Sequence, residues 1–291
     1  MTFSPINLET SSEKNHNSGH AETKQINPLR DTFIESLKIQ TRVIWALFLR
    51  EIITRYGRHG LGFLWLFLEP MMFSVGVTII WSVSGMVHIR GNSISMAGFA
   101  LTGYSSLVLW RNMVNRLANN TSYSKGLLYH PNVRVIDLIF SRALLEFAAC
   151  SLSLLLLTFV FWGLELIELP VDPLKVFVAW ALYAWFVFSA GMLAAYMGES
   201  SEIFERVVHV MMYLTLPLTG VFTMVAWMPP VIQKILLLSP LVNGVEMMRE
   251  GYFGMSIHAE YSVSYLIIVN LFITLLGLIL IRNIRRQLID G

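Results

Sequence analysis

Charged side chains inside long apolar stretches are the first candidates for chemistry in this sequence. Glu69 is the only acidic or basic residue between Gly60 and Val87, and Pro70 follows it directly. Burying a carboxylate in hydrocarbon costs about 2.5 kcal/mol or more. Glu69 therefore either lines a polar path at a turn perturbed by proline, or lies at headgroup level because a span begins near Pro70. The residues favour these two interpretations equally.

Arg111 and His209 are ionisable residues in later apolar stretches, and each of them has two possible roles. Arg111 either lies in the mouth of a channel and meets an anionic substrate, or extends its side chain to the cytoplasmic interface. His209 is expected to be a hydrogen-bonded packing residue more than a proton relay. Five tryptophans near expected span ends predict an interfacial belt, although some of them could stack on sugar rings instead: Trp65, Trp81, Trp110, Trp162 and Trp227.

Several sequence signatures of catalysis are missing from the chain. It contains no G-x-x-x-x-G-K-[ST], no H-E-x-x-H and no D-x-D, and its only cysteine is Cys150. The first absence predicts that the chain does not hydrolyse nucleotide itself. A single cysteine excludes an internal disulfide and a cysteine metal cluster. We therefore expect no catalytic residues and no metal site.

Composition indicates the elements that must position these residues. Apolar residues make up 55% of the 291 positions and charged residues only 14%, with a mean hydropathy of +0.60. Soluble domains carry about 25% charged residues. The sequence therefore predicts an all-α integral membrane protein with six transmembrane helices. The expected spans lie at about 61–83, 95–114, 147–164, 176–197, 207–225 and 262–281.

The N-terminal part is polar and then amphipathic. Residues 1–29 are expected to be a disordered cytoplasmic tail. Residues 30–57 repeat apolar side chains at helical intervals between charged ones, which predicts an amphipathic helix in the cytoplasmic interface. A cytosolic helix that packs on a soluble partner is the alternative. Residues 58–291 form the transmembrane domain.

The segment Trp227–Gly254 differs from the other apolar stretches. Pro229, Pro230 and Pro240 divide it into two short helical pieces. A pair of short helices that re-enters the outer leaflet fits this pattern, provided that protein or water shields the backbone. With both termini in the cytoplasm, seventeen of the 21 Lys and Arg residues lie inside, and fifteen remain without the two lysines of the tail. This bias predicts cytoplasmic termini.

The chain resembles a known family at four motifs. Residues 49–57 read L-R-E-I-I-T-R-Y-G, and residues 61–70 read L-G-F-L-W-L-F-L-E-P. R-A-L-L-E at 142–146 and S-P-L-V-N-G-V-E-M-M-R-E at 239–250 add to the likeness. Together they resemble the permease subunits of type-2 ABC transporters that export polysaccharides. The glutamate before the proline is similar to the capsular polysaccharide export permeases of Gram-negative bacteria.

The resemblance implies roles for particular residues. Residues 119–129 would couple to a separate ATPase subunit, with Asn119, Tyr123, Lys125 and Tyr129 as candidate contacts. The 227–254 segment would form a periplasmic gate that includes Pro240, Glu246, Arg249 and Glu250. The candidate residues of the translocation path or gate are Trp65, Glu69, Pro70, Tyr104, Arg111, Tyr213, Phe222 and Trp227.

The resemblance also implies an assembly in the inner membrane of a bacterium. Two copies of this chain and two ATPase subunits would move a lipid-linked capsular polysaccharide, and ATP and magnesium would bind to the ATPase, with no cofactor on this chain. A periplasmic adaptor similar to a co-polymerase and an outer-membrane export protein would be further partners, and no nucleic acid is expected. The missing P-loop fits this assembly, because the energy must then come from another chain.

Three other functions remain open at this point. A permease for O-antigen or another cell-surface glycan would share most of these motifs. A proton-coupled transporter or flippase would need several acidic or histidine residues in its spans, and only Glu69 and His209 qualify. A membrane enzyme that modifies lipid-linked sugars would turn over its substrate without an ATPase.

Overall fold

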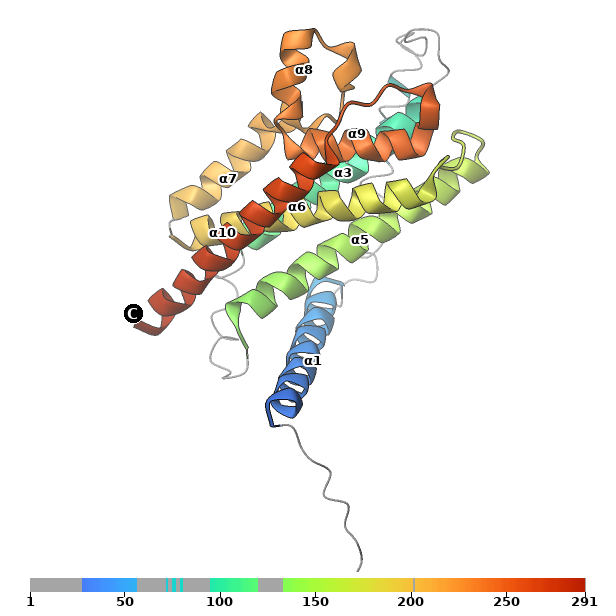
Figure 1. The fold of residues 1–291 in the computed structure, drawn as a ribbon. Coiled ribbons are helices and arrows are strands. Elements are labelled where there is room, and N and C mark those ends of the chain that lie inside the picture. The colour runs from blue at the N-terminus through green and yellow to red at the C-terminus, as the bar shows by residue number, and fades with distance from the viewer. Residues whose placement is uncertain are drawn as a thin grey trace, which may run out of the picture. The chain divides into compact units, whose positions relative to one another are not determined.

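The structure is a computed structural model that describes residues 28–56, 72, 75–76, 79–80, 95–119, 133–200 and 202–290. All regular structure in these residues is helical (Figure 1). Most of the expected span at 61–83 lies outside the described residues, as does most of the expected tail. The same holds for the site residues Trp65, Glu69, Pro70, Tyr123, Lys125 and Tyr129. The α-helices are α1 (Pro28–Tyr56), α3 (Met96–Ala118), α5 (Val135–Gly163), α6 (Pro173–Ser200), α7 (Glu202–Leu214), α8 (Pro230–Leu237), α9 (Pro240–Phe253) and α10 (Val263–Asp290), and the 3₁₀ turns are η2 (Leu216–Thr219), η3 (Val225–Trp227) and η4 (Gly254–Ser256).

Helices α3, α6 and α10 cover three of the expected spans. Helix α5 begins well before the uncharged stretch at 147–164, because its first turn is capped by its own polar residues. The backbone N–H of Arg134 donates to the Asp137 carboxylate at 2.9 Å. An acceptor of this kind satisfies backbone donors that a helix N-terminus leaves unpaired. Three charged residues therefore lie within the helix, before its uncharged stretch: Asp137, Arg142 and Glu146.

The expectation of one continuous span at 207–225 is wrong. Helix α7 ends at Leu214, and the chain continues into the 3₁₀ turn η2. Pro217 lacks the N–H that an α-helix requires, and Gly220 then adopts a left-handed conformation with φ of 70°. The connection between the expected spans at 176–197 and 207–225 is mostly helical, since α6 extends to Ser200 and α7 starts at Glu202.

Three helices in the described part of the chain are long enough and apolar enough to cross a membrane: α5, α6 and α10. Helices α8 and α9 taken together are also long enough and apolar enough to cross a membrane, and the bend between them is 102°. Pro230 and Pro240 each begin one of these two helices, so the expected pair of short helices is confirmed. Its place in a leaflet and the total of six spans stay predictions.

Helix α6 forms the centre of the bundle and contacts α3, α9 and α10. Side-chain hydrogen bonds fix it to three neighbours. Trp180 Nε1 donates to Ser151 Oγ of α5 at 2.8 Å, and the Tyr183 hydroxyl donates to the Ser106 carbonyl of α3 at 2.9 Å. Trp185 Nε1 donates to Thr274 Oγ1 of α10 at 2.9 Å. Near its end α6 approaches α3 so closely that a Cβ at Gly198 would collide with the carbonyl oxygen of Ala118.

The chain divides into two compact units, residues 1–39 and 40–291. Within the second unit, the C-terminal part of α1 contacts α5 through polar side chains. The Gln40 amide donates to the Asp137 carboxylate. The carboxylate of Glu51 lies 3.4 Å from Nε of Arg142. Helix α1 has nearly the bounds expected for the interface helix, and its position at a membrane interface stays a prediction.

Candidate functional site

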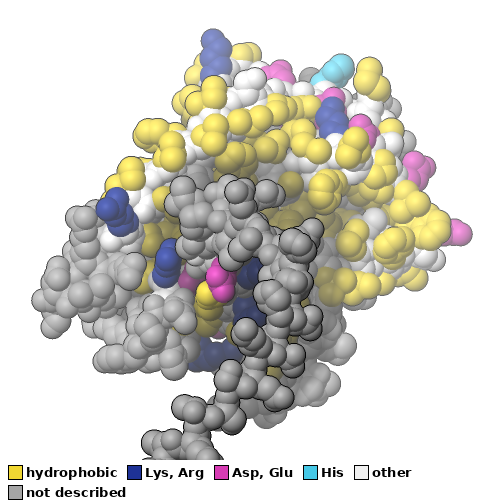
Figure 2. All heavy atoms as spheres, turned by 60° about the horizontal axis from the view of Figure 1, so that its bottom comes forward, with side chains coloured by type: hydrophobic (Ala, Val, Ile, Leu, Met, Phe, Trp, Pro, Cys, Tyr) yellow, Lys and Arg dark blue, Asp and Glu magenta, His cyan; other side chains and the backbone are white. Residues whose placement is uncertain are grey.

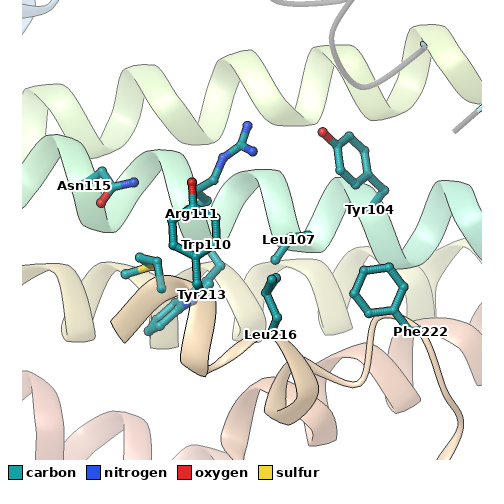
Figure 3. Close-up of a pocket in the computed structure, with 9 residues that line it drawn as sticks. Tyr104, Leu107, Trp110, Arg111, Asn115, Tyr213, Leu216 and Phe222 are labelled. Carbon is teal, nitrogen blue, oxygen red and sulfur yellow. The ribbon is translucent and has the colours of Figure 1, made fainter. Parts of the chain in front are cut away.

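A pocket of about 230 Å³ lies between α3 and the segment that runs from α7 through η2 (Figure 3). In Figure 3 the side chains of Tyr104, Leu107, Arg111 and Asn115 follow one another along α3, and Tyr213, Leu216 and Phe222 approach them from the facing segment. The described residues that line the pocket are Tyr104, Leu107, Trp110, Arg111, Asn115, Met212, Tyr213, Leu216 and Phe222.

The pocket combines aromatic rings with one guanidinium and one amide. Tyr104 is almost fully buried, whereas Tyr213 is 63% exposed and Phe222 is 42% exposed. The lining is therefore more buried on the α3 side and more exposed on the α7 side. Aromatic faces suit the apolar faces of sugar rings, and the arginine offers several donors that match a carboxylate or phosphate. In the described residues no group of three or more His, Cys, Asp or Glu side chains is arranged to hold a metal ion.

Four predicted path residues line this one pocket: Tyr104, Arg111, Tyr213 and Phe222. Trp227 does not line it and instead stacks on Phe99, with ring centroids 5.3 Å apart. Trp110 was expected in an interfacial belt, but it is only 9% exposed and stacks on Phe186. The functional role of these residues stays a prediction, because their placement alone does not test transport.

The remaining lining residues were not predicted from the sequence. Leu107 and Asn115 lie on the same face of α3 as Tyr104 and Arg111, at spacings of three and four residues. Residues at such spacings share one face of a helix. That spacing could have predicted from the sequence which residues of α3 form one wall of the pocket. The meeting of this wall with Met212 and Leu216 depends on the break after α7 and has no local signal.

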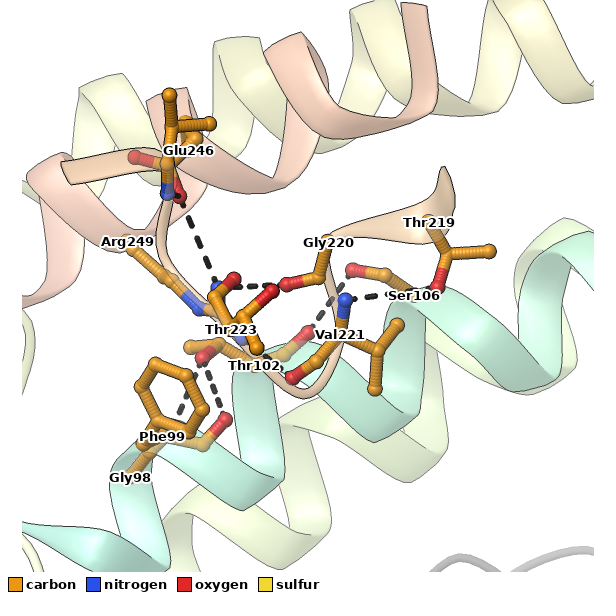
Figure 4. A network of polar contacts seen from close by, with 11 residues as sticks. Gly98, Phe99, Thr102, Ser106, Thr219, Gly220, Val221, Thr223, Glu246 and Arg249 are labelled. Atoms are coloured by element: carbon orange, nitrogen blue, oxygen red, sulfur yellow. Dashed lines mark hydrogen bonds and ion pairs between the residues drawn. The ribbon is translucent and has the colours of Figure 1, made fainter. Parts of the chain in front are cut away.

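A second polar centre surrounds Arg249 of α9, which is fully buried (Figure 4). Its guanidinium donates to three carbonyls of one loop. Nη1 donates to Gly220 O at 2.7 Å and to Thr223 O at 3.0 Å, and Nη2 donates to Val221 O at 2.6 Å. A single side chain of α9 therefore fixes the loop that follows η2. We call this set of contacts the Arg249 clamp.

Two further contacts complete the Arg249 clamp. The guanidinium carbon lies 3.7 Å from the centroid of the Phe99 ring, which places a cation on an aromatic face. Glu246 Oε1 lies 3.8 Å from Arg249 Nη1 and accepts the Val225 N–H at 3.2 Å. The clamp thus joins α3, α9 and the loop 220–225. Because this loop carries Phe222, the clamp also positions one wall of the pocket.

The other predicted gate residues lie at the ends of α9. Pro240 starts the helix, and Glu250 Oε1 lies 2.8 Å from Nζ of Lys175, at the beginning of α6. Tyr261 lies close to both charges, and Lys175 Nζ is 5.7 Å from its ring centroid. Burial raises the pKa of the Tyr261 hydroxyl, and the neighbouring Glu250 raises it further. The hydroxyl therefore stays protonated at neutral pH.

A third polar group joins α3 to α5. Arg116 Nε lies 2.6 Å from Oε1 of Glu146, whose side chain is 1% exposed. Asn119 ends α3 and donates its backbone N–H to the Asn115 carbonyl at 3.3 Å. It is the only predicted coupling residue among the described residues. The ion pair holds the last turn of α3 against α5.

Known proteins that are similar to this chain are named as polysaccharide export or polysialic acid transport proteins. The chain is 38% identical over 257 residues to the capsule polysaccharide export inner-membrane protein BexB of Haemophilus influenzae, which covers 87% of this chain and 95% of that protein. It is 39% identical over 249 residues to the capsule polysaccharide export inner-membrane protein CtrC of Neisseria meningitidis serogroup A, covering 86% and 93%. The polysialic acid transport protein KpsM of Escherichia coli is 28% identical over 248 residues, covering 84% and 95%.

A family profile covers most of the fold described above. The profile of the ABC-2 type transporter matches residues 42–253, which include α3, α5, α6, α7 and both short helices α8 and α9. The match contains the pocket and the Arg249 clamp, and it agrees with the resemblance read from the four sequence motifs. On the match to this profile and to relatives of nearly the same length, the chain belongs to the ABC-2 type transporter family.

Proposed function

We propose that this chain is the transmembrane subunit of an ATP-driven exporter that moves lipid-linked capsular polysaccharide across the inner membrane. The observation that carries the proposal is the pocket on α3, where Arg111 and several aromatic rings face one open cavity in a member of this transporter family. The names of the relatives support capsule as the cargo class and the inner membrane as the location.

The pocket suits weak and repeated contacts with a polymer. Tyr104, Tyr213 and Phe222 offer ring faces to successive sugars, and Arg111 offers hydrogen bonds to an acidic group on the glycan. Conduction requires binding that is strong enough for entry and weak enough for release. A lining with one cation and several aromatic rings meets both conditions for an acidic polysaccharide.

A homodimer would complete the path. The pocket is open on the side of Tyr213 and Phe222, both of which are exposed on α7 and the following loop. A second copy related by a two-fold axis, the commonest symmetry of oligomers, would place two such linings opposite each other.

The energy would come from two ATPase subunits, which bind ATP and magnesium, and this chain would act as a non-catalytic permease. The predicted coupling segment 119–129 follows α3 directly, and α3 carries the more buried wall of the pocket. A push on this segment would therefore be transmitted along α3 to Arg111 and Tyr104. The ion pair between Arg116 and Glu146 would make α5 move with it.

Helix α1 would lie in the cytoplasmic interface, with both termini in the cytoplasm. Trp45, Leu49 and Ile53 recur at intervals of four residues and are exposed by 56%, 42% and 68%. Residues at this spacing form one face of a helix. An exposed apolar stripe on α1 supports contact with lipid.

The bent pair α8–α9 would form the periplasmic gate. Its bend of 102° and its attachment to the pocket loop through Arg249 support this role. Beyond the gate, a periplasmic adaptor and an outer-membrane export protein would receive the polymer.

Reconstitution tests the proposal. Vesicles that contain this chain and its ATPase subunit are expected to accumulate labelled capsular polysaccharide only when ATP is supplied. A matched preparation carries an ATPase whose P-loop lysine is replaced, and it should show no accumulation. Transport that persists with the mutated ATPase, or that follows a proton gradient, would instead identify a proton-coupled transporter.

A further inference from the structure

A second pocket lies between the beginning of α5 and the end of the apolar stretch of α10. Its volume is about 200 Å³, and its described lining consists of Arg134, Val135, Ile136, Leu278, Ile281 and Arg282. Two guanidinium groups and four aliphatic side chains therefore border one small cavity. The pocket shares no residue with the cavity on α3 or with the Arg249 clamp.

The position of this pocket relative to the apolar helices is informative. The uncharged stretch of α5 begins only at Phe147, about three turns after Arg134, whereas the uncharged stretch of α10 continues to Ile281, directly before Arg282. Arg282 therefore lies where an apolar helix meets the headgroup region, because a span must end there, and Arg134 borders the same pocket. The space-filling view shows apolar side chains over much of the visible described surface, with several basic side chains below them and a few others at the edges (Figure 2).

The two arginines are exposed at the rim of the pocket. Neither guanidinium lies within ion-pairing distance of a carboxylate whose placement the structure describes. The acid nearest in sequence, Asp137, is buried and accepts hydrogen bonds from the Arg134 N–H and the Gln40 amide. The rim thus attracts an anion.

Below the rim the surface is apolar and continuous. Leu275, Leu278 and Arg282 lie on one face of α10, and the two leucines are 61% and 45% exposed. On α5, Phe140 follows Ile136 by one turn and is 42% exposed. A ligand that fits both parts of this surface has an anionic head and a long hydrocarbon chain. A free anion would use only the rim.

We propose that this pocket binds the phosphate headgroup of an anionic phospholipid of the surrounding bilayer, with an acyl chain along Leu278 and Leu275. Basic pockets at span ends are suited to such headgroups, and each nearby basic residue contributes about 1 kcal/mol to the attraction. The bound lipid would connect α5 and α10 at the end of the bundle where few protein contacts join them. This inference does not depend on the identity of the transported cargo.

Lipid titration followed by native mass spectrometry tests the proposal. The full-length chain in detergent is titrated with phosphatidylglycerol and, in parallel, with phosphatidylcholine that carries the same acyl chains. Phosphatidylglycerol is expected to bind first and more tightly. Arg134→Gln and Arg282→Gln should each weaken its binding about fivefold, and the double variant about 25-fold, since about 1 kcal/mol is lost at each position.

Two controls separate this site from general charge effects. Lys234→Gln removes an exposed cation on α8 and is expected to leave phosphatidylglycerol binding unchanged. Thermal unfolding in detergent without added lipid should be the same for all variants, which shows that they are folded. If the double variant accumulates poorly, the two single variants still have to show the fivefold loss.

Three results would overturn the proposal. Phosphatidylcholine could bind as tightly as phosphatidylglycerol, or the arginine variants could bind phosphatidylglycerol like the wild type. Inorganic phosphate could displace the lipid at equal concentration, and the pocket would then be a site for free phosphate. Failure of these tests leaves the proposed export function untouched, because that function is measured by ATP-dependent transport.

Discussion

Arg111 and Arg249 are both arginines in apolar surroundings, and they differ in what their guanidinium groups face. Arg249 is fully buried and donates to three carbonyls of one loop while its plane lies on Phe99. Arg111 lines a pocket whose opposite wall is exposed. One guanidinium closes a loop inside the protein, and the other borders a space that a ligand can enter.

This difference in environment indicates how a structural arginine can be distinguished from a functional one in this family. Removing the buried guanidinium of Arg249 leaves carbonyls without donors and a carboxylate without its counter-charge, and each such group costs free energy. Removing an arginine from an open pocket lets water solvate its former neighbours. Replacing Arg249 should therefore lower the stability of the protein, whereas replacing Arg111 should lower transport.

The largest effect is expected for Arg249→Met. It leaves the carbonyls of Gly220, Val221 and Thr223 without their donor and the carboxylate of Glu246 without its cation, and the loss of stability should be about 3–5 kcal/mol. Thermal unfolding of the purified chain, followed by tryptophan fluorescence, measures it. Arg111→Met is the matched control and should lose less than about 1 kcal/mol. Equal losses for the two variants would contradict the comparison.

Gly103→Ala should give the next largest loss of stability. A Cβ at Gly103 would lie 2.7 Å from the Val221 carbonyl oxygen and 3.0 Å from Arg249 Nη2, so it pushes directly on the Arg249 clamp. Overpacking of this kind costs about 1–3 kcal/mol, and the better helix propensity of alanine offsets part of it. At Gly163 a Cβ meets nothing within 4 Å, so Gly163→Ala serves as the control in the same unfolding assay and should be neutral.

Much of the bundle followed from local signals in the sequence. The starts of α8 and α9 lie at Pro230 and Pro240, because proline at the first position of a helix loses no hydrogen bond. The break after α7 was signalled by Pro217 and Gly220, but the high hydropathy of the stretch led to a continuous span. Apolar composition sets whether a segment can be buried, and it does not set where the backbone turns.

The two arginine environments could not be read from the sequence. Arg249 reaches Gly220 across 29 residues, and no spacing rule connects an arginine of one helix to carbonyls of a distant loop. The α3 wall of the pocket has a helical spacing that the sequence does show. Its partners Tyr213 and Phe222 meet it only because α7 ends early and the loop folds back under Arg249.

Arg111→Gln is expected to lower transport without changing stability. A hydrogen bond to a charged group contributes about 1.5–3 kcal/mol, so ATP-dependent uptake of an acidic polysaccharide into reconstituted vesicles should fall about tenfold or more. Arg111→Lys keeps the charge but loses the planar fork, and it should fall less. Uptake by Arg111→Gln at the wild-type rate, with an unchanged unfolding temperature, would show that the pocket does not contact the cargo.

The smallest effect is expected at the pair Lys175 and Glu250, which joins α9 to the beginning of α6 at 2.8 Å. Both side chains are more than a quarter exposed, and pairs exposed to water contribute about 0.2–1 kcal/mol. The coupling energy is measured from the unfolding of Lys175→Met, Glu250→Gln and the double variant. A coupling above about 2 kcal/mol would mean that this partly exposed pair holds the α8–α9 hairpin as firmly as the buried Arg249 does. In that case exposure would no longer distinguish the structural cations of this bundle from the rest.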